Sequence, residues 1–326
     1  MRNKNSFHSK AHIFNINQPV SKLHLLLNQL MSDTFFVRPV ALCGLRIAAY
    51  SLVLANTTTA KANIGSVSAA TGNAGIAAIE ASESPSSNPA TLGYMQGYYF
   101  ATGYGSSTQD QFDGNEFNIS LTDALKDTVV PSSLLYNQGK WTQKDSGQQW
   151  DSKRFQLSFG NQFNKIFSFG LGVNFQNDHW QDVSYNQTNL VVGGMMTPNR
   201  NIGFGIVFQN LFSADKKIPQ AARLPQRTIV GSTFHFRKLV RFKFDVSSDQ
   251  ANSWQKPLLM GGVENYLNKW IIFRVGALRN NDLDAGAWSA GLGFVLPKFA
   301  FHYAYQTSAE SEQLNRHSVD LAIPVW

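Results

Sequence analysis

Side chains that could carry out chemistry are few and scattered in this chain. His302 could act as a general base, but no Gly-x-Ser-x-Gly sequence supplies the strained turn that exposes a serine nucleophile. His317 and Ser318 are adjacent, so on a strand they point to opposite faces and cannot form a catalytic pair. We therefore predict that the protein is not an enzyme and has no catalytic residue and no cofactor.

Metal-binding and redox-active groups are equally sparse. Asp178, His179 and Asp182 could bind a metal, but a solvated loop is the simpler interpretation of these three residues. The single cysteine, Cys43, lies close to the N-terminus, ahead of the segment that we expect to be retained. The mature chain would therefore contain no thiol and no disulfide, and we predict no metal site.

A larger set of ionisable residues alternates with apolar residues. Arg241, Lys243 and Asp245 are separated by Phe242 and Phe244, so they share one face of a strand. The residues that we expect to face a common interior are Arg241, Lys243, Asp245, Glu264, Arg274, Arg279, His302 and Asp320. They could form a polar pathway or hold an internal segment, although a solvated or mutually paired lining is the simpler interpretation.

The elements that would position these side chains are strands, and residues 155–175 show the pattern best. Phe167, Phe169 and Leu171 fall on one face of such a strand, whereas the residues between them are Ser and Gly. Asn164 and Lys165 form a tight turn between this strand and a similar one before it. The small and polar face cannot supply a dry core, so the apolar face must find another apolar environment.

The whole chain after residue 95 repeats this pattern. We predict fourteen strands: 96–104, 115–123, 130–141, 154–163, 166–176, 188–197, 201–209, 227–236, 241–249, 257–266, 269–279, 287–296, 299–307 and 316–325. Short turns such as 297–298 alternate with longer polar loops such as 105–114, 142–153 and 177–187. An even number of strands of about ten residues with this alternation is typical of a bacterial outer-membrane barrel.

The predicted fold class is therefore all-β, a 14-stranded antiparallel transmembrane β-barrel surrounded by outer-membrane lipid. Closure satisfies every strand edge, which lipid could not do. After residue 60 no run of about 20 apolar residues suggests a helical membrane protein. A soluble β-sandwich or lipocalin-like barrel would need its apolar faces inside, but here the opposite faces consist mainly of Gly, Ser, Asn and Gln.

The basic net charge belongs to the N-terminal leader. Residues 1–62 hold seven Lys or Arg and one Asp, which accounts for +6 of the formal +7. We therefore predict no nucleic-acid partner. Arg38, an apolar run over residues 41–55 that contains Arg46, and Ala60-Lys61-Ala62 predict a signal peptide over about 31–62, cleaved after Ala62. Residues upstream of 31 would not belong to the mature protein.

Residues 63–95 are small and polar, with enough Ala, Ile and Val to pack inside another structure. Gly72 and Gly75 interrupt this segment, and residues 74–81 could form one or two helical turns. Asn88-Pro89-Ala90 stiffens the approach to the first strand. The predicted organisation is a leader over 1–62, this segment over 63–95 and a barrel over 96–326.

The chain resembles the FadL-type outer-membrane proteins, and among them the shorter PorV-like members. The resemblance rests on Gly72-Asn73-Ala74-Gly75 and Asn88-Pro89-Ala90 directly before the first of fourteen strands. In FadL-type proteins the segment with the Asn-Pro-Ala sequence is a hatch that plugs the barrel. The resemblance therefore implies a hatch over 63–95 that includes Gly72, Gly75, Asn88, Pro89 and Ala90.

This resemblance implies passive uptake of small hydrophobic compounds, gated by the hatch. A hydrophobic ligand or lipid would occupy the lumen, and the barrel-assembly machinery would insert the protein into the bacterial outer membrane. The alternatives are a PorV-like barrel that binds another envelope protein during secretion, or a purely structural outer-membrane protein. The shorter loops depart from the fatty-acid transporters, in which such loops hold the outer hydrophobic groove.

Overall fold

A computed structural model describes residues 65–109, 111–180, 183–219, 222–237, 239–249, 254–309 and 314–325. The predicted leader over 1–62, its cleavage site and its cysteine lie outside the described residues, and so does Asp182. The predictions about the leader, its cleavage site, Cys43 and Asp182 therefore stay predictions. Among the described residues, no helix is both long enough and apolar enough to cross a bilayer.

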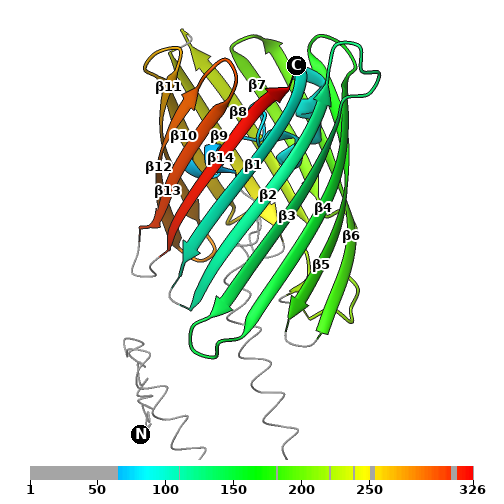
Figure 1. Ribbon diagram of the computed structural model, residues 1–326, viewed down its shortest axis with the longest axis vertical. Coiled ribbons are helices and arrows are strands. Elements are labelled where there is room, and N and C mark those ends of the chain that lie inside the picture. Colours follow the sequence, from blue (N-terminus) through cyan, green and yellow to red (C-terminus); the bar gives the residue numbers. More distant parts are fainter. Residues whose placement is uncertain are drawn as a thin grey trace, which may run out of the picture. The chain divides into compact units, whose positions relative to one another are not determined.

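Fourteen antiparallel strands close into one barrel, as predicted (Figure 1). Each strand pairs with its neighbours in sequence, and β1 closes the ring on β14. The strands are β1 Gly97–Thr108, β2 Phe112–Ala124, β3 Ser132–Gln143, β4 Gln149–Gln162, β5 Phe167–Trp180, β6 Val183–Asn199, β7 Ile202–Gln209, β8 Arg227–Phe236, β9 Val240–Asp249, β10 Leu258–Tyr266, β11 Ile271–Asn280, β12 Ala285–Val295, β13 Ala300–Ser308 and β14 Asn315–Val325. Closure leaves no strand edge that lipid would have to satisfy.

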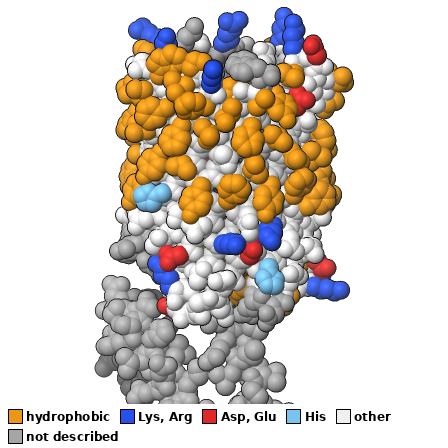
Figure 2. All heavy atoms as spheres, viewed as in Figure 1, with side chains coloured by type: hydrophobic (Ala, Val, Ile, Leu, Met, Phe, Trp, Pro, Cys, Tyr) orange, Lys and Arg blue, Asp and Glu red, His pale blue; other side chains and the backbone are white. Residues whose placement is uncertain are grey.

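The apolar faces of the strands point outward and form a belt around the barrel. In β5, Phe169 is 61% exposed, whereas the neighbouring Ser168 is fully buried on the inside. Figure 2 shows the hydrophobic side chains gathered in a band, with charged residues above and below it. Such a belt is stable against hydrocarbon and would be costly in water, so the barrel is a transmembrane structure of the outer-membrane type.

Several connections are shorter than the sequence predicts because the strands continue into them. The predicted loops 105–114 and 142–153 reduce to 109–111 and 144–148, since β1, β2, β3 and β4 extend further in the loop direction. Polar residues outside the membrane can still pair their backbones, so apolar alternation ends before the strand does. The loop between β7 and β8, residues 210–226, keeps its predicted length.

Residues 65–95, which we call the hatch, lie inside the barrel (Figure 1). The hatch contains α3 Ser66–Ala70, α4 Ser84–Ser87 and the 3₁₀ helix η2 Pro89–Tyr94. α3 contacts β11–β14, whereas η2 contacts β4–β6. The helix expected within 74–81 does not form there, because the amides of Gly75 and Ile76 donate to Asp245 of the wall.

Candidate functional site inside the barrel

A cluster of charged side chains on β9–β11 lines the wall beside the hatch. Strand register places Glu264 of β10 directly opposite Arg241 of β9 and Arg274 of β11. Glu264 Oε2 accepts from Arg241 Nε at 2.6 Å, and Glu264 Oε1 accepts from Arg274 Nε at 3.0 Å. Lys243 Nζ lies 2.9 Å from Glu264 Oε1. One fully buried carboxylate therefore has three cationic partners, which leaves positive charge for a second anion.

The hatch supplies that second anion through Glu80. Its carboxylate pairs with Arg241, and its Oε1 lies 3.8 Å from Lys243 Nζ. Burial by itself would raise the pKa of Glu80, but the charges of Arg241 and Lys243 hold that pKa below its ordinary value. Glu80 is therefore an ionised group that ties the hatch to the wall.

Two wall carboxylates bind the backbone of the hatch. Asp245 Oδ2 accepts from the amides of Gly75 and Ile76 at 2.7 and 3.1 Å. Asp320 Oδ2 accepts from the amide and the hydroxyl of Ser66 at 2.6 and 2.9 Å. Hydrogen bonds to a carboxylate are about twice as strong as neutral ones, so these contacts fix the first half of the hatch.

The Asn-Pro-Ala turn fits into a gap that wall glycines leave open. Asn88 Oδ1 accepts from the Ala90 amide at 3.0 Å and so caps η2, while Asn88 Nδ2 donates to the Ile76 carbonyl at 2.8 Å. A Cβ at Gly170 would lie 2.3 Å from the Pro89 carbonyl carbon, and one at Gly160 would lie 2.2 Å from the Pro89 oxygen. Any side chain at either position would displace the backbone of this turn.

Gly72 contacts the opposite side of the wall in the same way. Its φ of +65° is a left-handed conformation that favours glycine. Its amide donates to Ser289 Oγ at 3.0 Å. A Cβ on Gly276 of β11 would lie 2.2 Å from the Gly72 nitrogen. Close backbone approach therefore holds the hatch at two separated points.

A small cavity of about 100 Å³ remains between the hatch and the wall. Its apolar lining consists of Ile76 from the hatch and of Ile229, Leu258, Met260 and Leu278 from β8, β10 and β11. Its polar lining consists of Ser68, Asn73, Gly75, Ser87, Gln209, Arg227, Asp245 and Ser247. An apolar cavity of about 150 Å³ can hold benzene, so this one is slightly too small for a single aromatic ring while the hatch stays in place.

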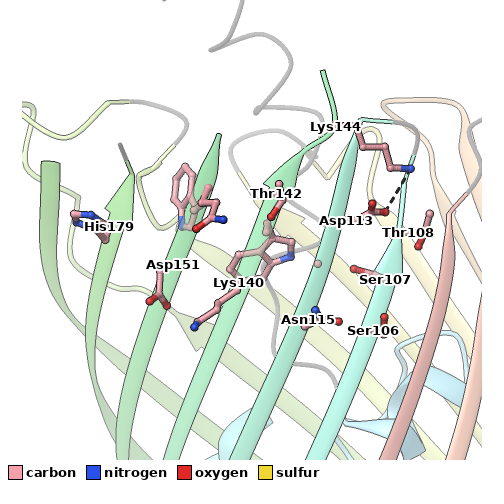
Figure 3. Close-up of a pocket in the computed structure, with 14 residues that line it drawn as sticks. Ser106, Ser107, Thr108, Asp113, Asn115, Lys140, Thr142, Lys144, Asp151 and His179 are labelled. Carbon is pink, nitrogen blue, oxygen red and sulfur yellow. Dashed lines mark ion pairs between the residues drawn. The ribbon is translucent and has the colours of Figure 1, made fainter. Parts of the chain in front are cut away.

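A wider cavity of about 730 Å³ lies at the loop ends of β1–β5 (Figure 3). Its lining is mainly polar and includes the ion pair between Lys144 Nζ and Asp113 Oδ1 at 3.4 Å. Trp141 and Trp150 are the two aromatic residues of this lining. This polar region suits water and polar groups, whereas the cavity beside the hatch has one apolar side.

The structure places most of the sequence-predicted residues together. Buried side chains of Arg241, Lys243, Asp245, Glu264, Arg274, His302 and Asp320 all face the hatch side of the wall. His302 Nδ1 accepts from Arg274 Nη1 at 3.2 Å, because arginine can only donate. Arg279 differs: it is exposed and pairs with Asp284. An odd spacing of five residues from Arg274 puts it on the other face of β11.

Two further predictions concern pairs of neighbouring residues. Asp178 and His179 were expected in a loop, but both lie in β5, because this strand continues beyond the apolar belt. Asp178 is buried inside and accepts from Gln176, whereas His179 is exposed and contacts Ser184. His317 is exposed and Ser318 is buried, so the predicted separation onto opposite faces is confirmed. Within the described ranges, no group of three His, Cys, Asp or Glu side chains could hold a metal ion.

Sequence reasoning missed Glu80 and Glu83. They are the only charged residues between 65 and 95, so their isolation in a small, polar segment was a signal. Glu83 Oε1 accepts from Ser68 Oγ at 2.5 Å. Burial, and then the negative charge of Asp320, raises the pKa of Glu83 to about 7. Glu83 is therefore the hatch group whose charge changes near neutral pH.

Solved structures with a similar fold include hydrocarbon channels and a FadL homologue. The Ralstonia pickettii toluene transporter TbuX is 12% identical, with 81% of this chain and 100% of that chain covered and a TM-score of 0.65. The CymD monoaromatic hydrocarbon channel is also 12% identical, with 80% of this chain and 97% of that chain covered and a TM-score of 0.65. A Pseudomonas aeruginosa FadL homologue is 10% identical, with 80% of this chain and 98% of that chain covered and a TM-score of 0.60. No family model and no curated protein matches the sequence.

The predicted resemblance to the FadL-type fold is confirmed by these structures. At 10–12% identity the likeness shows the fold, a 14-stranded outer-membrane barrel, and leaves the transported compound open. The closer similarity to the PorV-like members stays a prediction.

Proposed function

We propose that this barrel lets small apolar compounds of about the size of one aromatic ring diffuse across the outer membrane, and that the hatch gates their passage. The observation that carries this proposal is the apolar side of the cavity between Ile76 of the hatch and the wall. Transfer of an apolar ring from water into such a lining is favourable by about 25 cal/mol for each Å² buried. The toluene transporter and the monoaromatic hydrocarbon channel of similar fold support the proposal that the compound is a small apolar one.

The size of the cavity supports gating. A ring needs slightly more than the 100 Å³ present, so Ile76 would have to move away from the wall as a compound enters. Ile76 is tied to the wall through its amide, which donates to Asp245 at 3.1 Å. Entry of a compound would therefore strain the Asp245 contact and release the first half of the hatch.

The test is uptake of radiolabelled toluene by cells that carry the protein or a variant. Met260→Trp fills the cavity from the wall, and we expect it to lower protein-dependent uptake by about tenfold or more, the scale by which an apolar pocket discriminates. The matched control is Leu259→Trp, one residue away on the lipid face, where an indole is tolerated. Equal uptake with and without the protein would exclude this function.

The alternative function, a barrel that binds another envelope protein, gives the opposite result in that assay. Under the alternative, toluene uptake would not depend on the barrel and Met260→Trp would have no effect. Dependence of uptake on Met260 but not on Leu259 would favour transport.

A further inference from the structure

The short turns at one end of the barrel share a feature that the lumen and the hatch do not explain. Of the six connections at this end, five contain no acidic residue, at 163–166, 200–201, 237–239, 267–270 and 296–299. The sixth, residues 125–131, holds both Lys126 and Asp127. Each of the five carries an exposed cation, and these are Lys165, Arg200, Arg237, Lys269 and Lys298. We call these five residues the turn collar. Figure 2 shows Lys and Arg side chains along this upper rim, directly above the apolar belt.

The opposite end of the barrel has a different arrangement of charge. There Lys144 pairs with Asp113 at 3.4 Å, and Lys256 pairs with Asp282 at 3.7 Å. In the part of the chain that the structure describes, no side chain of the turn collar lies within 4.0 Å of a carboxylate. The positive charge of the collar is therefore available to an external anion.

Two of the turns have the same local construction. Asn164 Oδ1 accepts from the amides of Ile166 and Phe167, both at 2.8 Å. Asn268 Oδ1 accepts from the amides of Trp270 and Ile271 at 2.7 and 2.9 Å in the second turn. In both cases the lysine follows the asparagine, so the asparagine closes the turn and leaves the lysine at its tip.

Apolar side chains surround these cations at the tips of the turns. Phe163 is 82% exposed beside Lys165, and Leu267 is 63% exposed beside Lys269. Lys269 Nζ lies 4.7 Å from the centre of the Trp270 ring, and the Arg237 guanidinium lies 5.2 Å from that of Phe236. A cation next to an apolar group suits the boundary between acyl chains and headgroups. There the apolar group contacts the acyl chains and the cation contacts the headgroups.

We propose that the turn collar binds the phosphate groups of anionic phospholipids in the leaflet around the turn end. Short turns face the periplasm in barrels of this type, so this is the inner leaflet of the outer membrane. The five cations are distributed over separate turns, which fits several individual headgroups better than one compact multivalent ligand. Exposed Phe163 and Leu267 favour a lipid over a soluble anion, because the acyl chains would cover them.

The test uses the mature protein purified in mixed micelles with equal amounts of phosphatidylglycerol and phosphatidylcholine. Mass spectrometry of the lipids that stay with the protein measures the preference. We expect phosphatidylglycerol to be enriched by about tenfold, and the enrichment to fall with added salt. The variant K165Q/R200Q/R237Q/K269Q/K298Q should lose the enrichment.

Two controls separate this effect from misfolding and from general charge. The loop-end variant K140Q/K153Q/K216Q/K217Q/K256Q removes five charges as well and should keep the enrichment. The variant K165R/K269R/K298R keeps the charge and should also keep the enrichment.

A heat-dependent shift in electrophoretic mobility shows whether the glutamine variant of the collar is folded. The proposal is overturned if that folded variant retains phosphatidylglycerol like the parent. It is also overturned if inorganic phosphate at the same total phosphate concentration displaces the lipid, since that result would indicate a soluble anion. Neither outcome depends on toluene uptake.

Discussion

Both sides of the barrel approach the backbone of the hatch closely, but they differ in the charged side chains that they add. On β4 and β5, Gly160 and Gly170 let the wall approach the Asn-Pro-Ala turn to direct backbone contact. On β9–β11, charged side chains hold Glu80 and the residues around it. The strength of a contact between backbone atoms does not depend on pH or salt, whereas the strength of an ion pair does. Under the proposed gating, η2 would be the fixed part of the hatch, and the Glu80–Glu83 region would be the part whose contacts depend on charge.

The largest effect should come from the charged side. Glu264→Gln leaves Arg241, Lys243 and Arg274 buried with one carboxylate, Glu80, among them. Breaking a buried ion pair typically costs about 3–5 kcal/mol, and we expect a loss of this size in the free energy of unfolding. Urea unfolding in lipid vesicles, followed by tryptophan fluorescence, measures it. The double variant Glu264→Gln/Arg274→Gln restores the charge balance and should regain part of the loss; no recovery would argue against the electrostatic explanation.

A smaller effect is expected on the glycine side. In Gly170→Ala the new methyl would meet the Pro89 carbonyl carbon and the Ala90 nitrogen at 2.3 and 2.4 Å, and neither can move without shifting η2. Overpacking of this kind typically costs about 1–3 kcal/mol. Faster thiol labelling of a Ser82→Cys reporter would show that the hatch is displaced.

Gly194→Ala is the matched control for that substitution. Its methyl would meet a methyl group of Ile206 at 3.3 Å and the ring of Phe169 at 4.0 Å, both on the outside of the barrel. Equal labelling rates in the Gly170 and Gly194 variants would mean that backbone contact with the wall does not fix the hatch.

The smallest effect for a single experimental step should be a pH dependence through Glu83, which develops gradually with each pH unit. Because its pKa rises from 4.5 to about 7 when it is buried, the closed hatch holds a proton that a released hatch would lose. Stability of the closed state is then constant below pH 4.5 and decreases as the pH rises toward 7, by on the order of 1 kcal/mol for each pH unit. The charged groups that act on Glu83 are Asp320, Lys243 and Glu80.

Thiol labelling of Ser82→Cys between pH 4 and pH 8 checks this dependence. The labelling rate is divided by that of free cysteine at the same pH, because ionisation of the thiol itself speeds labelling. We expect this relative rate to rise with pH, and Glu83→Gln, which stays neutral, to remove the trend. A trend that persists in Glu83→Gln would assign it to another group.

Local alternation in the sequence was enough to predict much of the fold. The Phe and Leu residues of 155–175 indicated which face meets lipid, because side chains on a strand alternate with a period of two. The same rule separated His317 from Ser318. The same rule places Arg279 and Arg274 on opposite faces of β11, because they are five residues apart. The strand ends were predicted less well, since strands continue past the apolar belt where water, rather than lipid, surrounds them.

The sequence by itself determined a fourteen-stranded barrel with a lipid-facing surface and an interior of small and charged residues. Only the tertiary structure decided which interior residues meet. Register placed Glu264 between Arg241 and Arg274, which lie on the strands to either side of it. The position of the hatch brought Glu80 to the same cluster and the Asn-Pro-Ala turn to Gly170. Periodicity fixes the face of a residue, but its level in the barrel depends on how neighbouring strands pair.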